Sequence, residues 1–419
     1  MNKIIDFLKK RVWIIILIAG ILFIPQSFNY QAKINMRVLV TGIGIDKTEN
    51  GYEVTAQVIM PTPGSESGGS GARLDFISET GESISEGVQK IAYKIGKTAG
   101  LSHAGFVIVG ENVLEENLVT LLDFFARDAK VNPSLMLLIC EGNAKDTLKQ
   151  TGKLELSVGV DLQKVFIYKQ SSLNGLVMPI EEFINATFGI SKSSIASGIT
   201  IAPEGEENTS SKAQNESGGN EQEGSSQGSN QTQAKNARIK FYNEIYYFKD
   251  GKYIGKLDEE YQILGVFFTD KTANNGEFKI SGVTGGILED ATVGVSFTDK
   301  KASTKVKFKN GKPTFTFNIK IKDIKITEML NNDKPSVNLY NKMDKETMNV
   351  IKEKIKEEVQ NFIISAFEQA KADGVDIFDV GEKMYQTKTK EWKKFYDEYG
   401  DNYLKNLDVK VNVEILNIN

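Results

Sequence analysis

One stretch decides the fold class: residues 103–140 read HAGFVIVG, then ENVLEENLVTLLDFFARDAK, then VNPSLMLLIC. The first segment predicts a strand over His103–Val109, and the second predicts a helix over Glu115–Ala129 because its apolar residues recur at helical spacing. The third, Ser134–Cys140, is almost continuously apolar, which is typical of a strand buried on both faces of a sheet. This order of elements favours mixed α/β packing, with helices covering a sheet.

The residues before this stretch extend the same pattern. Two predicted strands, Arg37–Ile45 and Tyr52–Met60, flank a turn in which Asn50-Gly51 supplies the positive φ angles of a hairpin. An amphipathic helix is predicted over Ser83–Thr98, because apolar residues recur there at intervals of three and four. The N-terminal region therefore alternates strands with helices.

The extreme N-terminus predicts a membrane anchor. A basic cluster, Lys9–Arg11, precedes thirteen uninterrupted apolar residues, Val12–Ile24. Extension of this run to Phe28 gives about 25 Å of helix, close to the lower limit for crossing a membrane. The basic cluster places residues 1–11 in the cytoplasm and the rest of the chain outside. The predicted anchor residues are Val12, Ile14, Ile15, Ile16, Leu17, Ile18, Ile21, Leu22, Phe23 and Ile24.

Residues 203–236 differ in composition from the rest of the chain. They contain six Glu and two Lys, and they lack Val, Ile, Leu, Met and all aromatic residues. Such a segment cannot bury enough apolar surface to offset its conformational entropy, so we expect a disordered acidic linker. The predicted regions are thus a signal anchor (1–34), an N-terminal α/β region of one or two domains (35–202), the linker (203–236) and a C-terminal α+β region (237–419).

The C-terminal region is predicted to be rich in strands and then helical. Asp250-Gly251 and Asn310-Gly311 each predict a hairpin turn, and Asp344 is a good N-cap for a long helix that ends before Gly374. The last predicted strand, Val409–Ile415, alternates apolar and polar side chains. Other elements predicted here are strands over Thr292–Thr298, Ser303–Lys309 and Thr314–Ile326, and a helix or pair of turns over Glu391–Leu404.

Composition excludes several classes of site. A net charge of −4 and only five scattered arginines argue against a nucleic-acid-binding surface. The single cysteine, Cys140, and the single histidine, His103, exclude a disulfide framework and the usual Cys- or two-His metal sites. We therefore expect no metal, no cofactor and no catalytic residues. Acidic pairs such as Glu181-Glu182 point apart in regular structure, so they give only slight support to a glycoside hydrolase.

The ordered set of short motifs resembles the Ger(x)C family, the C subunits of spore germinant receptors. The segments that carry the resemblance are Gly42–Lys47, Gly51–Val58, Leu101–His103, Val107–Gly110, Leu122–Asp128, Ala144–Leu148, Tyr247–Leu257 and the closing block Ala372–Phe378 with Gly381, Trp392 and the final strand. Together they span most of the chain outside the linker. The resemblance implies an α+β fold of three mixed α/β domains with helices packed on β-sheets, preceded by the membrane anchor.

The resemblance also implies a function and partners. It implies a non-catalytic subunit that works with two integral-membrane partners, of A and B type, at the spore's inner membrane in nutrient-triggered germination. Candidate partner contacts lie in the closing block, at Asp376, Phe378 and Trp392. Family members usually carry a lipid-modified cysteine after the signal, and Pro25–Tyr30 contains none. An uncleaved helix is therefore expected to serve as the anchor.

Two other functions stay open at this stage. One is a membrane-anchored extracytoplasmic enzyme that hydrolyses cell-wall glycan, which would need two carboxylates facing each other across a cleft. The other is a general extracytoplasmic scaffold outside sporulation.

Overall fold

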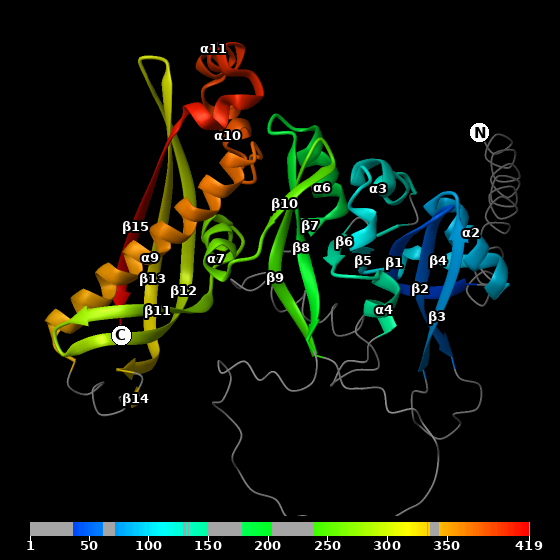
Figure 1. The fold of residues 1–419 in the computed structure, drawn as a ribbon, viewed down its shortest axis with the longest axis horizontal. Coiled ribbons are helices and arrows are strands. Elements are labelled where there is room, and N and C mark those ends of the chain that lie inside the picture. The colour runs from blue at the N-terminus through cyan, green and yellow to red at the C-terminus, as the bar shows by residue number, and fades with distance from the viewer. Residues whose placement is uncertain are drawn as a thin grey trace, which may run out of the picture.

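The computed structural model describes residues 37–61, 72–96, 98–128, 131–132, 134–149, 178–202, 238–332, 334–335 and 343–418. The predicted anchor, Val12–Ile24, and the predicted linker, 203–236, lie outside these residues. Of the helices within them, none is long and apolar enough to cross a membrane. The described part is a mixed α/β structure built on two sheets (Figure 1).

The first sheet runs in the order β10-β9-β8-β6-β5-β1-β2-β3, with β4 beside β1 and β7 beside β6. Its strands are β1 (Arg37–Thr48), β2 (Gly51–Pro61), β3 (Ala72–Gly81), β4 (Thr98–Gly100), β5 (Phe106–Gly110), β6 (Met136–Cys140), β7 (Met178–Pro179), β8 (Ser193–Ala202), β9 (Arg238–Lys249) and β10 (Lys252–Leu257). The central strands β1, β5, β6 and β8 are parallel, and the flanking hairpins are antiparallel. The predicted turn at Asn50-Gly51 joins β1 to β2.

Helices cover both faces of this sheet. They are α2 (Ile84–Ile95), α3 (Leu118–Arg127), α4 (Ala144–Lys149) and α6 (Ile180–Phe188). Every residue of β5 and β6 is buried, as the apolar stretch at 134–140 predicted. One face, which includes Val107 and Leu137, packs in a core with α2, α3 and α6. The other face, which includes Ile108 and Leu138, packs with α4 and is continuous with the core of the second sheet.

Local capping signals set the helix ends. The hydroxyl of Ser83 accepts a hydrogen bond from the Glu86 N–H at 3.2 Å, which starts α2, and Gly96 at φ 66° ends it. The side chain of Asn117 accepts the N–H of Val119 at 3.0 Å and so starts α3 at residue 118, later than the predicted 115.

The second sheet runs in the order β11-β12-β13-β14, and β15 pairs with β13 in parallel. Its strands are β11 (Gly276–Gly285), β12 (Leu288–Lys309), β13 (Lys312–Asn331), β14 (Lys334–Pro335) and β15 (Asp408–Ile418). The predicted break between Thr298 and Ser303 is wrong, since β12 is one continuous strand. The polar run there includes Lys300, whose side chain is buried and donates to the carbonyls of Phe267 and Phe268 at 2.9 and 3.0 Å.

The C-terminal helices are α7 (Glu260–Thr269), α9 (Lys345–Ala372), α10 (Val380–Thr387) and α11 (Thr389–Tyr399). The long helix α9 lies across one face of the second sheet (Figure 1), and Asp344 caps its start as predicted. Helix α7 packs closely on α9 at Gly265, where an added Cβ would lie 2.2 Å from the carbonyl oxygen of Phe362. No pattern in the sequence predicted α7 or α10.

The chain passes from the first sheet to the second after β10. Strands β9 and β10 belong to the predicted C-terminal region, yet β9 pairs with β8 and β10 pairs with β9, so they complete the first sheet. The strands on either side of residues 203–237 are therefore neighbours in space. The finer division into three domains stays a prediction.

Candidate functional site

The predicted contact residues belong to the turn between α9 and α10 and to α11. Asp376 and Trp392 are buried, with 2% and 3% of their surface exposed, and Phe378 is partly buried against Phe317 and Phe367. Asp376 and Trp392 face the interior of the described structure, whereas Phe378 is partly accessible. Their contact with a partner stays a prediction.

Asp376 organises the polypeptide around it. Its carboxylate accepts the N–H groups of Val380 and Gly381, at 2.9 and 2.7 Å, and the hydroxyl of Tyr403 at 2.5 Å. The first two bonds place a negative charge at the start of α10, which the helix dipole favours. Burial raises the pKa of Asp376, while the three donors oppose that rise. This carboxylate therefore joins α10 to the 3-10 turn η4 (Gly400–Asn406) before the last strand.

Trp392 packs against the same tyrosine. The two rings meet edge to face, with centroids 4.9 Å apart. Gly381 is required beneath them, because an added Cβ would lie 2.7 Å from the Tyr403 hydroxyl. The resemblance picked out Asp376, Gly381 and Trp392 together, and the structure brings all three together around Tyr403.

A row of hydrogen bonds ties the first sheet to this block. From β9, Tyr247 Oη donates to the carboxylate of Asp373, and Lys249 Nζ donates to the carbonyl of Gly374 at 2.7 Å. The N–H of Asp376 donates to Ser193 Oγ of β8 at 3.0 Å. The N–H of Ile190, in the loop before β8, donates to Glu382 Oε2 at 3.3 Å. These bonds join β8, β9 and the loop before β8 to residues 373–382. They fix one wall of the cleft described next.

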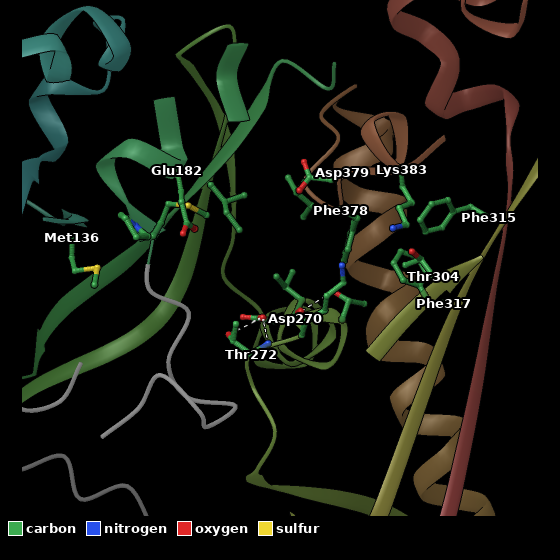
Figure 2. A pocket seen from close by; sticks show the side chains of 17 residues that line it. Met136, Glu182, Asp270, Thr272, Thr304, Phe315, Phe317, Phe378, Asp379 and Lys383 are labelled. Carbon is green, nitrogen blue, oxygen red and sulfur yellow. Dashed lines mark hydrogen bonds between the residues drawn. The ribbon is translucent and has the colours of Figure 1, made fainter. Parts of the chain in front are cut away.

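A cleft of about 600 Å³ opens between the two sheets. Figure 2 shows Asp379 and Lys383 on the side of α10, Glu182 on the side of the first sheet, and Asp270 with Thr272 after α7. The apolar part of the lining includes Met136, Met178, Phe315, Phe317 and Phe378. Of the three predicted contact residues, Phe378 alone is part of this lining. The cleft thus combines an aromatic and thioether wall with charges of both signs.

Asp379 is the most perturbed carboxylate in the cleft. It is exposed toward the cleft, yet protein surrounds its other sides, and this desolvation raises the pKa of Asp379 to about 6. The negative charges of Asp376 and Glu382 add to the rise, whereas the Ser191 hydroxyl opposes it. Its backbone lies in the left-handed region at φ 53°, which aspartate tolerates better than most residues.

The other charged groups differ in how far they are engaged. The carboxylate of Asp270 accepts both the N–H and the hydroxyl of Thr272, at 2.7 and 2.9 Å, so it is held within its own turn. Lys383 is half-buried and forms no ion pair with any described residue. The cleft can therefore offer a free ammonium group and the carboxylate of Asp379 to a polar partner.

The structure describes Cys140 but not the predicted anchor residues. The ten anchor residues between Val12 and Ile24 lie outside the described residues. Cys140 is buried in β6, and burial raises the pKa of its thiol to about 12. Within the described ranges, no three His, Cys, Asp or Glu side chains gather in a group that could hold a metal ion.

Two family models match the chain. Spore germination protein N-terminal domain matches residues 30–201, and Spore germination B3/GerAC like, C-terminal, matches residues 243–418. Spore germination protein KC of Bacillus subtilis (strain 168) is 19% identical over 97% of this chain and 95% of its own. Spore germination protein B3 of the same strain is 22% identical over 85% of this chain and 86% of its own. The crystal structure of the GerBC protein covers 90% of this chain and 97% of that chain, with a TM-score of 0.49 at 15% identity.

Proposed function

Because the chain belongs to the Ger(x)C family of spore germination proteins, we propose that this germinant receptor C subunit acts by contact and catalyses no reaction. The observation that carries the proposal is the extent of the family match. The two matched regions, 30–201 and 243–418, include strands of both sheets and almost all the described residues. The relatives KC and B3 align over most of their own length as well.

The partners we propose are the integral-membrane A- and B-type subunits of the receptor, at the spore's inner membrane. The apolar run Val12–Ile24 after Lys9–Arg11 supports a membrane-held chain with its body on the outer face. The closing block supports a contact role through the cleft, where Phe378 lines the wall. In this arrangement Asp376 and Trp392 act beneath the contact surface, by holding α10 and η4 in place.

The absence of catalysis is part of the proposal. The carboxylates of Asp376 and Asp270 are engaged by donors of the chain itself, which suits a structural role.

One observation favours a second candidate, a cell-wall glycan hydrolase. Asp379, whose pKa is raised to about 6, and Glu182 lie on facing sides of one cleft. Glycoside hydrolysis requires such a pair, namely a carboxylic acid of raised pKa and a second carboxylate.

Nutrient germination of spores tests the two candidates. We expect deletion of the gene, in a strain without a paralogue that replaces it, to abolish or greatly slow germination by the nutrient that this receptor detects. Complementation with Asp379→Asn should restore it, since the amide keeps the shape of this side chain and its hydrogen-bonding capacity in the cleft, and a contact subunit needs no titrating acid. Normal germination of the deletion strain would overturn the proposal. Loss of function in Asp379→Asn, together with release of glycan fragments by the purified wild type, would favour the hydrolase.

A further inference from the structure

The β12–β13 hairpin carries an unusual concentration of positive charge. Between residues 300 and 325 the chain has nine lysines and one aspartate, whereas the whole protein has a net charge of −4. Figure 1 shows the turn of this hairpin at one end of the second sheet, near α11. The two strands are paired without a break from Lys300 to the turn at Asn310-Gly311.

The strand register places most of these lysines on one face. Lys305, Lys307 and Lys309 alternate along β12, and their opposite neighbours on β13 are Thr316, Thr314 and Lys312. The same register adds Lys301, Ser303, Asn318 and Lys320 to this face. On the neighbouring strand β15, Lys410 pairs with Thr316 and Asp408 pairs with Thr314, so this strand extends the face sideways with one charge of each sign. We call these residues the lysine face.

The opposite face of the hairpin is the one that packs on the protein. Val306 is buried, and the ring of Phe308 meets that of Phe395 on α11 at a centroid distance of 6.2 Å. The lysine face therefore points away from α11. Among the described residues, its side chains near the turn are lysine, serine, threonine and asparagine, with Asp408 of β15 as one acidic neighbour and no aromatic group.

The lysines near the turn are exposed and unpaired. Lys301, Lys305, Lys307, Lys309 and Lys312 are all exposed, and none forms an ion pair with a described residue. Lys320, directly opposite Lys301, does have a partner, Glu414, at 3.2 Å. Five unneutralised charges on one face repel each other, so their proximity is favourable only when an anionic surface lies opposite.

We propose that the lysine face docks on the headgroups of anionic phospholipids. The face is a broad sheet surface without an apolar wedge, which suits a planar layer of charges. Lysine is a flexible point charge and needs no fixed geometry, so it can follow fluid headgroups, whereas arginine is preferred for bidentate contacts. Each lysine near such a surface strengthens binding roughly fivefold, and the attraction falls off within a Debye length.

Nucleic acid and protein fit this face less well. Proteins that bind single-stranded nucleic acid use aromatic side chains on which the bases stack. Proteins that read the bases of duplex DNA place Arg, Asn or Gln on an element that fills a groove. The lysine face has neither arrangement near the turn. A protein interface would show a buried apolar centre, which the Ser, Thr and Asn side chains do not provide. The proposal rests on the membrane location proposed above and adds which face turns toward the lipid.

Energy transfer in vesicles tests the docking. The full-length chain carries a donor dye at Ser303→Cys, on the lysine face, and the vesicles carry an acceptor on their headgroups. Because Cys140 is buried, with a thiol pKa raised to about 12, the dye reacts with the introduced thiol. We expect strong transfer in vesicles that contain phosphatidylglycerol, weak transfer in phosphatidylcholine alone, and loss of the difference at high salt.

Two matched triple variants make the test specific. Replacement of Lys305, Lys307 and Lys309 by Gln should lower the ratio of docked to undocked hairpin by on the order of a hundredfold. In the control variant, Gln replaces Lys149, Lys252 and Lys345. These three lysines are also exposed and have no ion pair with a described residue, so the control should leave transfer unchanged. Equal transfer in both vesicle types, equal loss in both variants, or binding to duplex DNA in preference to the anionic vesicles would overturn the proposal. None of these results would alter the germination phenotype, so the two proposals fail separately.

Discussion

At the residue scale, Asp379 combines three properties that sequence patterns do not reveal. It lies in the left-handed backbone region at φ 53°, it opens into the cleft, and its pKa is raised to about 6 by desolvation and by Asp376 and Glu382. In the sequence it follows Phe378 as one acidic residue among 55. Its environment comes from α10, from the loop at Ser191 and from Lys271 after α7, and these segments meet only in the fold.

The raised pKa predicts the sign of a pH effect on stability. Asp379 binds its proton more tightly in the folded than in the unfolded chain, so its contribution to stability is complete below about pH 4 and is lost as pH rises through about 6. Since the side chain reaches solvent in the cleft, we expect this contribution to be about 1 kcal/mol. Thermal unfolding of wild type and Asp379→Asn at pH 4 to 8 measures it as the pH-dependent difference between the two. A constant difference across this range would contradict the assignment.

At the scale of elements, the sequence predicted those helix starts and hairpin turns that depend on hydrogen bonds between near neighbours in the chain. Asp344 caps its helix as expected, and Asn50-Gly51, Asp250-Gly251 and Asn310-Gly311 form the predicted turns. In each case the deciding hydrogen bonds join residues only a few positions apart.

Elements set by long-range packing were missed or misread. Helix α7 is buried over Gln262–Phe268, so it has no polar face and no helical periodicity to detect. Strand β12 continues through polar residues because Lys300 reaches the end of α7, which lies about thirty residues away in the chain. The parallel pairing of β15 with β13 and the pairing of β9 with β8 across residues 203–237 also have no local signal. The resemblance located the closing block, but not the burial of Asp376 and Trp392.

The Asp376 carboxylate predicts how this block responds to mutation. In Asp376→Asn, the amide cannot accept all three donors, so a buried N–H or the Tyr403 hydroxyl loses its partner. We expect a loss of about 2 to 3 kcal/mol in the free energy of unfolding, measured by denaturant titration. Tyr403→Phe should cost about 1 kcal/mol.

An exposed substitution on the neighbouring helix provides the comparison. Glu391→Gln on α11 should change the free energy of unfolding by no more than about 0.5 kcal/mol. An unaltered unfolding midpoint in Asp376→Asn would show that the carboxylate does not hold α10 and η4 together.

At the scale of the whole molecule, the two sheets form one connected core. The apolar face of β5 and β6 that includes Ile108 and Leu138 is continuous with the core under α7 and α9. Polar bonds from Tyr247, Lys249 and Ser193 add a second connection at the α9–α10 turn. The cleft therefore lies between parts of one connected body.

Co-purification from spores tests this account most directly. The full-length chain, tagged at its C-terminus, is isolated from detergent-solubilised inner membranes of spores, and mixing with an untagged extract controls for association after lysis. The account predicts that one A-type and one B-type multi-span protein are recovered with the chain in similar amounts. Recovery of the chain without them, from membranes that contain both, would contradict its role as a receptor subunit.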